Sequence, residues 1–164
     1  MRAPRIPLTS LLAAALGAAL LAGCGGGATK GEEQPAACRE GVQTYLEALA
    51  AAPGEVVLAG ETPISGCFTI DPEEGELADL GEATVAAATK LNAEARAEPG
   101  GEANVELGYL LGAMTRGEAE TEGVHAELLR RLAVAARFVP EGEQLSPRFT
   151  EAYEKGFAAG REHG

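Results

Sequence analysis

Apolar residues recur every three or four positions through most of this chain, and proline and glycine interrupt the pattern at intervals. The interruptions are Pro53-Gly54, Pro99-Gly100-Gly101 and Pro140 with Gly142. A spacing of three to four places apolar side chains on one face of an α-helix, whereas proline and glycine end helices. The pattern therefore predicts an all-α fold, a small bundle of about five helices in one domain.

Two of these helices have clear starting signals. Asp71-Pro72 and Ser146-Pro147 each combine an N-cap acceptor with proline in the first helical turn. Gly117 either ends the third helix or lies inside a longer one. We expect a short extended piece at Val56–Leu58 to cover a core edge without an evident pairing partner. The predicted helices cover residues 36–52, 71–98, 103–116, 118–139 and a last one from 146 towards the C-terminus.

Two glycine pairs bear on how such helices could pack. Gly108 and Gly112 lie four residues apart in the third predicted helix, and Gly156 and Gly160 have the same spacing in the fifth. A glycine inside a helix costs about 0.5–1 kcal/mol relative to alanine, but it lets another backbone approach closely. We expect packing seams here, between the third and fifth helices. Alternatively, a chain rich in glycine and alanine produces this spacing by chance.

The first 24 residues follow the order of an export signal. Arg2 and Arg5 precede an almost wholly apolar run from Leu8 to Ala22, which is short for a membrane-spanning helix. The run ends in Leu21-Ala22-Gly23-Cys24, which resembles the lipobox of bacterial lipoproteins. The resemblance implies that the Cys24 thiol receives a diacylglyceryl group, with acyl chains such as palmitate, and that cleavage precedes Cys24. An uncleaved anchor, or a signal cut elsewhere, would leave Cys24 unmodified.

These features divide the chain into three parts. Residues 1–23 form the expected signal peptide, 24–35 a flexible tether of about 18 Å root-mean-square span, and 36–164 the helical domain. The expected location is the extracytoplasmic face of the cell membrane, held by the lipid anchor. In its bias towards arginine, alanine, glycine and glutamate, the mature part resembles lipoproteins of unassigned role from high-GC bacteria. That resemblance implies no role for any single residue.

The mature chain is strongly acidic. After Cys24 is exposed by cleavage, 25 acidic and eleven basic residues remain, a balance of −14. Phosphate backbones and anionic lipid headgroups would repel such a domain. We therefore expect no nucleic-acid partner, and we expect the domain to stand off the bilayer on its tether.

Two cysteines remain besides Cys24. Cys38 and Cys67, 29 residues apart, form an even pair in an exported chain and predict a disulfide. The bond would stabilise the fold by about 3–4 kcal/mol in the chain-entropy account. The alternative is two free thiols, one of them catalytic. An oxidising compartment and the lack of a Cys-x-x-Cys pattern argue against it.

Candidate chemistry is sparse. Glu122 and His125 have the Glu-x-x-His spacing of metal ligands in ferritin-like bundles, but those sites need a second pair, and His163 follows Gly160 instead of a glutamate. His125 also suits a half-buried place beside the core. The acidic residues 71–76 lack the pattern of a calcium loop. We find no nucleophile motif and predict neither a metal nor another cofactor.

Three functional hypotheses follow. The first is a non-enzymatic helical module of the cell envelope that binds a protein partner or serves as a structural part. The second is a small-ligand binder, with a pocket lined by Tyr45, Tyr109, Met114 and Phe138. The third, which has the least support, is an enzyme that uses Glu122 and His125.

Overall fold

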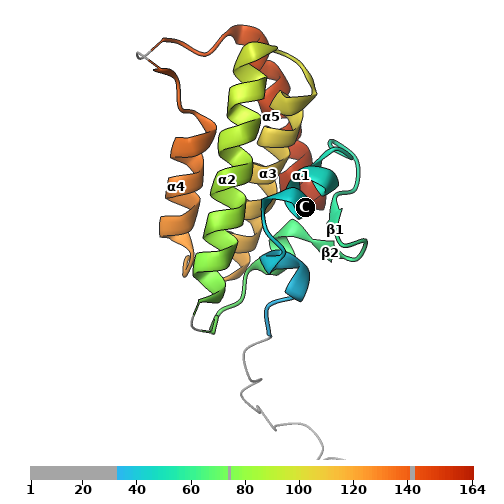
Figure 1. Ribbon diagram of the computed structural model, residues 1–164, viewed down its shortest axis with the longest axis vertical. Helices are drawn as coiled ribbons and strands as arrows, with labels where there is room; N and C mark the ends of the chain where they lie inside the picture. Colours follow the sequence, from blue (N-terminus) through green and yellow to red (C-terminus); the bar gives the residue numbers. More distant parts are fainter. Residues whose placement is uncertain (1–32, 74, 141–142) are drawn as a thin grey trace, which may run out of the picture. The chain divides into compact units, whose positions relative to one another are not determined.

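The computed structural model describes residues 33–73, 75–140 and 143–164. It confirms the all-α prediction, with five α-helices, two short 3-10 helices and one two-stranded sheet in these residues (Figure 1). No helix within them combines the length and the apolar character needed to cross a membrane.

Helix α3 (Glu102–Glu120) lies at the centre of the bundle. It packs against α2 (Glu76–Ala97), α4 (Ala126–Ala136) and, most extensively, α5 (Pro147–His163) (Figure 1). The core between these helices contains few large side chains, so alanine and glycine make much of the contact. The largest fully buried side chains are Tyr45, Leu49, Leu58, Ile64, Leu80, Leu91, Leu107, Tyr109, Leu110, Met114, Leu132 and Phe149.

The first predicted helix, residues 36–52, is in fact two shorter ones. A 3-10 helix, η1 (Ala36–Arg39), is followed by α1 (Val42–Leu49). Gly41 separates them with φ of +91°, a backbone conformation that an α-helix cannot contain. This break allows Cys38 and Tyr45 to be buried together beside Cys67.

The extended piece at Val56–Leu58 does have a pairing partner, contrary to expectation. Strand β1 (Val57–Leu58) pairs antiparallel with β2 (Thr62–Pro63). Ala59 and Gly60, the central residues of the turn from Leu58 to Glu61, both have positive φ, at +50° and +84°. Such turns usually carry Asn-Gly or Asp-Gly, and the Ala-Gly sequence therefore gave no hairpin signal. A second 3-10 helix, η2 (Ile64–Cys67), follows directly.

The second helix begins four residues later than Asp71-Pro72 predicts, at Glu76 instead of Pro72. Gly75, with φ of +98°, precedes α2, and the Glu76 carboxylate accepts a hydrogen bond from the Glu73 amide at 2.9 Å. The segment before α2 is not helical, and Phe68 and Thr69 within it are buried. Tertiary burial here overrides a good local capping signal.

The boundary between the third and fourth helices also differs from the prediction. Helix α3 continues through Gly117, so this glycine does not end the helix. Its lack of a side chain makes room for η2, since an added Cβ would lie 2.7 Å from the Ser65 carbonyl oxygen. Helix α4 begins at Ala126, not near Glu118, since Glu122 and Gly123 have positive φ and form a turn. The start of α5 is confirmed: the Ser146 hydroxyl accepts a hydrogen bond from the Phe149 amide at 3.1 Å.

Candidate functional site

The predicted disulfide between Cys38 and Cys67 is confirmed. Both cysteines are fully buried, and so is Tyr45, whose hydroxyl donates to the Cys38 carbonyl oxygen at 3.0 Å. Burial raises the pKa of Tyr45, so this phenol stays protonated and remains a hydrogen-bond donor. The bond joins η1 to η2 and leaves neither sulfur as a thiol. A catalytic cysteine at either position is therefore excluded in this oxidised state.

The folded unit begins earlier than the expected boundary at residue 36. Gln34 is only 2% exposed, and its side-chain amide donates to the Cys67 carbonyl oxygen at 2.7 Å. The end of the predicted tether thus belongs to the structure around the disulfide. Cys24 and the predicted signal peptide lie outside the described residues.

The two glycine pairs face each other across the contact between α3 and α5. We call Gly108, Gly112, Gly156 and Gly160 the glycine seam. An added Cβ at Gly108 would collide with the Tyr153 carbonyl oxygen, and one at Gly156 with the Val105 carbonyl oxygen. The other two positions are equally crowded by backbone atoms of the opposite helix. Backbone therefore meets backbone at all four positions, which is the geometry expected of a packing seam.

Glu122 and His125 do not form a site together. Glu122 is exposed in the turn before α4, whereas His125 is buried and its Nε2 lies 2.7 Å from the Thr69 carbonyl oxygen. Among the described residues, no group of three or more His, Cys, Asp or Glu side chains could hold a metal ion. His125 serves instead to tie the segment before α2 to the start of α4.

The pocket suggested by the sequence does not form either. Tyr45, Tyr109 and Met114 are fully buried in the core, while Phe138 is 58% exposed beyond the end of α4. These four side chains therefore line no common cavity. Their aromatic and sulfur-containing side chains had suggested a ligand pocket, but Tyr45, Tyr109 and Met114 pack in the core instead.

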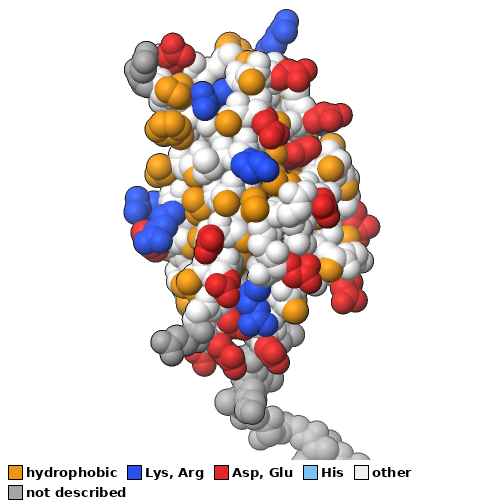
Figure 2. Space-filling model, viewed as in Figure 1, with side chains coloured by type: hydrophobic (Ala, Val, Ile, Leu, Met, Phe, Trp, Pro, Cys, Tyr) orange, Lys and Arg blue, Asp and Glu red, His pale blue; other side chains and the backbone are white. Residues whose placement is uncertain are grey.

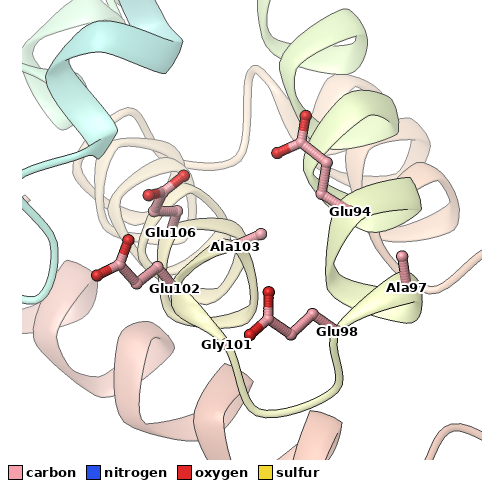
Figure 3. A pocket seen from close by; sticks show the side chains of 7 residues that line it. All are labelled: Glu94, Ala97, Glu98, Gly101, Glu102, Ala103 and Glu106. Atoms are coloured by element: carbon pink, nitrogen blue, oxygen red, sulfur yellow. The ribbon is translucent and has the colours of Figure 1, made fainter.

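A hollow that the sequence analysis did not identify lies where α2 turns into α3. Four glutamates line it, one from α2, one directly after α2 and two from α3, and Figure 3 labels all four. Its volume is about 680 Å³, and its lining residues include no lysine or arginine. The sequence does contain a signal for this hollow, because its glutamates recur every four residues. Within a helix, that spacing places side chains on one face. The glutamates are Glu94, Glu98, Glu102 and Glu106.

The hollow changes the acidity of Glu106. Burial raises the pKa of its carboxyl group, and the negative charges of Glu102 and Glu94 raise it further. The folded state therefore binds this proton more tightly than the unfolded chain does. The contribution of Glu106 to the free energy of unfolding therefore falls as the pH rises through the range between the ordinary and the raised pKa.

We expect Glu106→Gln to stabilise the protein at pH 7, because the amide removes a carboxylate that the fold disfavours. The gain should vanish below the ordinary glutamate pKa of 4.5, where the wild-type carboxyl is protonated in both states. Melting temperatures at the two pH values measure this. Glu151→Gln, exposed on α5, is the matched control. Equal differences between Glu106→Gln and wild type at both pH values would contradict the electrostatic account.

Comparison of the chain with models of protein families, with curated proteins and with solved structures gave no match. The functional argument therefore depends on the residues and the geometry described above.

Proposed function

We propose that this chain is a lipid-anchored helical module on the extracytoplasmic face of the cell membrane, which acts by binding a protein partner. The observation that carries the proposal is the buried Cys38–Cys67 disulfide, which closely follows the lipobox-like sequence at Cys24. Structural disulfides persist in oxidising compartments outside the cytosol, so the bond and the export signal support the same location.

The position of the four-glutamate hollow supports a role in binding. The described chain begins at one end of the bundle, and the turn from α2 to α3 lies at the other (Figure 1). Helix α2, whose 22 residues span about 33 Å, runs between these ends. A tether from Cys24 would join the bundle at the first end, so the hollow would lie at the end far from the point of attachment. Its four carboxylates suit a basic segment of an envelope protein.

Cys24→Ser is expected to release the protein from the membrane, because the hydroxyl cannot form the thioether to the lipid. Wild-type protein should sediment with membranes and enter the detergent phase, whereas the variant should stay in the aqueous phase. The disulfide should still form in the variant, which shows that the bundle is intact. Equal membrane association of the two proteins would refute the lipid anchor.

The partner is tested by crosslinking in intact cells before detergent is added. A triple variant, Glu98→Gln with Glu102→Gln and Glu106→Gln, should lose the crosslinked species that wild type forms. The matched control changes three exposed glutamates outside the hollow, Glu47, Glu151 and Glu154, and should keep it. If both variants crosslink equally, the hollow is not the contact, although the lipid anchor would still stand.

A further inference from the structure

The outward side of α4 differs in charge from the rest of the molecule. Residues 126–138 carry three arginines and one glutamate, whereas the mature chain as a whole has a balance of −14. The inward side of α4 is buried in the core through Leu128, Leu132 and Ala136. The exposed side chains of this segment that matter here are Glu127, Arg130, Arg131, Val134, Arg137 and Phe138, which we call the α4 face.

Glu127 offsets only part of the positive charge of the α4 face. Its carboxylate accepts hydrogen bonds from Arg130 Nε and Nη2, at 2.8 and 2.9 Å, and from Arg131 Nε at 3.1 Å. One carboxylate thus lies beside two guanidinium groups, and Arg137 adds a third positive charge further along. Three arginines and one glutamate leave the α4 face with a net charge of +2.

Two large apolar side chains are exposed among these arginines. Val134 is 59% exposed and Phe138, just beyond the end of α4, is 58% exposed. Val134 lies four residues after Arg130, a spacing that places both on the same side of the helix. In Figure 2, basic and hydrophobic side chains lie next to each other along the left edge, where Figure 1 places α4. Most acidic side chains visible in this view lie away from that edge.

Arginines around exposed apolar side chains suit the surface of an anionic bilayer. The arginines are attracted to negatively charged headgroups, and the apolar side chains enter the boundary between headgroups and acyl chains. The acidic remainder of the domain is repelled by the same headgroups. Charge therefore selects the α4 face, and no other part of the described surface, for contact with such a bilayer.

The proposed lipid anchor would keep a bilayer within reach of this face. Only eight residues separate Cys24 from Glu33, where the described chain begins, and fully extended they reach about 30 Å. Helix α4 begins at the same end of the bundle as the described chain (Figure 1). A short tether gives an effective concentration on the order of 1 mM, so that a weak attraction is sufficient for contact.

We propose that the α4 face lies against the anionic lipid headgroups of the membrane that anchors the chain, an inference that rests on the lipid anchor proposed above. The net charge of the chain predicts a domain that stands off the bilayer, but the uneven distribution of charge lets one face attach. The four-glutamate hollow would be repelled by the same headgroups and would stay open to a protein partner.

A single fluorescent probe can test this contact, because the chain contains no tryptophan and Phe138→Trp would introduce one on the α4 face. The native lipidated protein with this substitution is placed in nanodiscs whose brominated acyl chains quench an inserted tryptophan. Quenching should occur with about one third phosphatidylglycerol and not with phosphatidylcholine alone. Salt at 1 M, where the screening length is about 3 Å, should weaken it. Ala158→Trp, exposed on α5, is the matched control and should stay unquenched.

The contribution of the arginines is measured in the Phe138→Trp protein. Arg130→Gln with Arg131→Gln and Arg137→Gln should lower the ratio of attached to free domains by on the order of 100-fold, about five-fold for each arginine. The matched control removes the same number of positive charges from exposed positions on α5 and should keep the quenching. It combines Arg148→Gln, Lys155→Gln and Arg161→Gln.

Retention in the nanodiscs separates the failure of the anchor from the failure of this contact. A protein that is retained, but in which Phe138→Trp is quenched no more than Ala158→Trp, would overturn the contact and leave the anchor in place. Equal quenching in the two lipid mixtures would also overturn it. A fluorescence change that needs no lipid and grows with protein concentration would assign the α4 face to a second copy of the chain instead. The comparison of lipids needs no arginine variant and decides the question if the triple variant does not fold.

Discussion

Gly156→Ala is expected to destabilise the protein by about 3 kcal/mol or more, although alanine is the best helix former. The added methyl group would occupy the position of the Val105 carbonyl oxygen on α3. That oxygen belongs to a helix backbone and cannot turn aside as a side chain could. The two helices would have to separate along the whole glycine seam, which would open voids on both sides.

Thermal unfolding followed by far-UV circular dichroism measures this effect. For a domain of this size, 3 kcal/mol corresponds to a fall of about 10 °C in Tm. Gly81→Ala on α2 is the matched control, because its Cβ would meet only the end of the Leu128 side chain, at 3.3 Å. It should leave the stability unchanged or raise it by up to about 1 kcal/mol. If both variants melt at the wild-type temperature, α3 and α5 do not pack through their backbones.

Replacement of both Cys38 and Cys67 by alanine is expected to cost about 3–4 kcal/mol. The bond closes a loop of 29 residues, and its removal restores conformational freedom to the unfolded chain. The loop contains α1 and the β1–β2 hairpin, which supply buried residues such as Leu49 and Leu58. Without the bond, α1 and the hairpin are held by packing alone. Tyr45 also loses the contact of its hydroxyl with the Cys67 sulfur, which is 3.6 Å away in the structure.

The same melting experiment, with and without a thiol reductant, checks the disulfide prediction. Reductant should lower the Tm of wild type by about 10–15 °C and should leave the double-alanine variant unchanged. The Cys24→Ser variant serves as a control, because it keeps the disulfide and should respond to reductant as wild type does. A double-alanine variant as stable as wild type would show that the loop contributes little.

Much of the fold could be predicted from periodicity and from helix-ending residues. The apolar stripes gave the all-α class, and Ser146-Pro147 gave the start of α5, because these signals act within one or two turns. The equally good signal at Asp71-Pro72 failed, and α2 begins only after Gly75, whose φ of +98° an α-helix cannot contain. The β1–β2 hairpin was missed because its turn uses Ala59, a residue that rarely adopts positive φ.

The sites were harder to predict than the fold, because they depend on contacts between helices. The four-residue spacing within each glycine pair indicated a close approach of the third and fifth helices, and the structure shows that the two pairs meet. The four-glutamate hollow requires that the turn at residues 99–101 brings the acidic faces of α2 and α3 together. The contact between His125 and the Thr69 carbonyl oxygen could not be predicted from local sequence, because 56 residues separate them.

The intact mass of the native protein tests the central claim most directly. The account predicts a chain that begins at Cys24, carries the added mass of acyl groups on that residue, and gains two hydrogens on reduction of the single Cys38–Cys67 bond. A chain that begins elsewhere, or one without acyl mass at Cys24, would contradict the account.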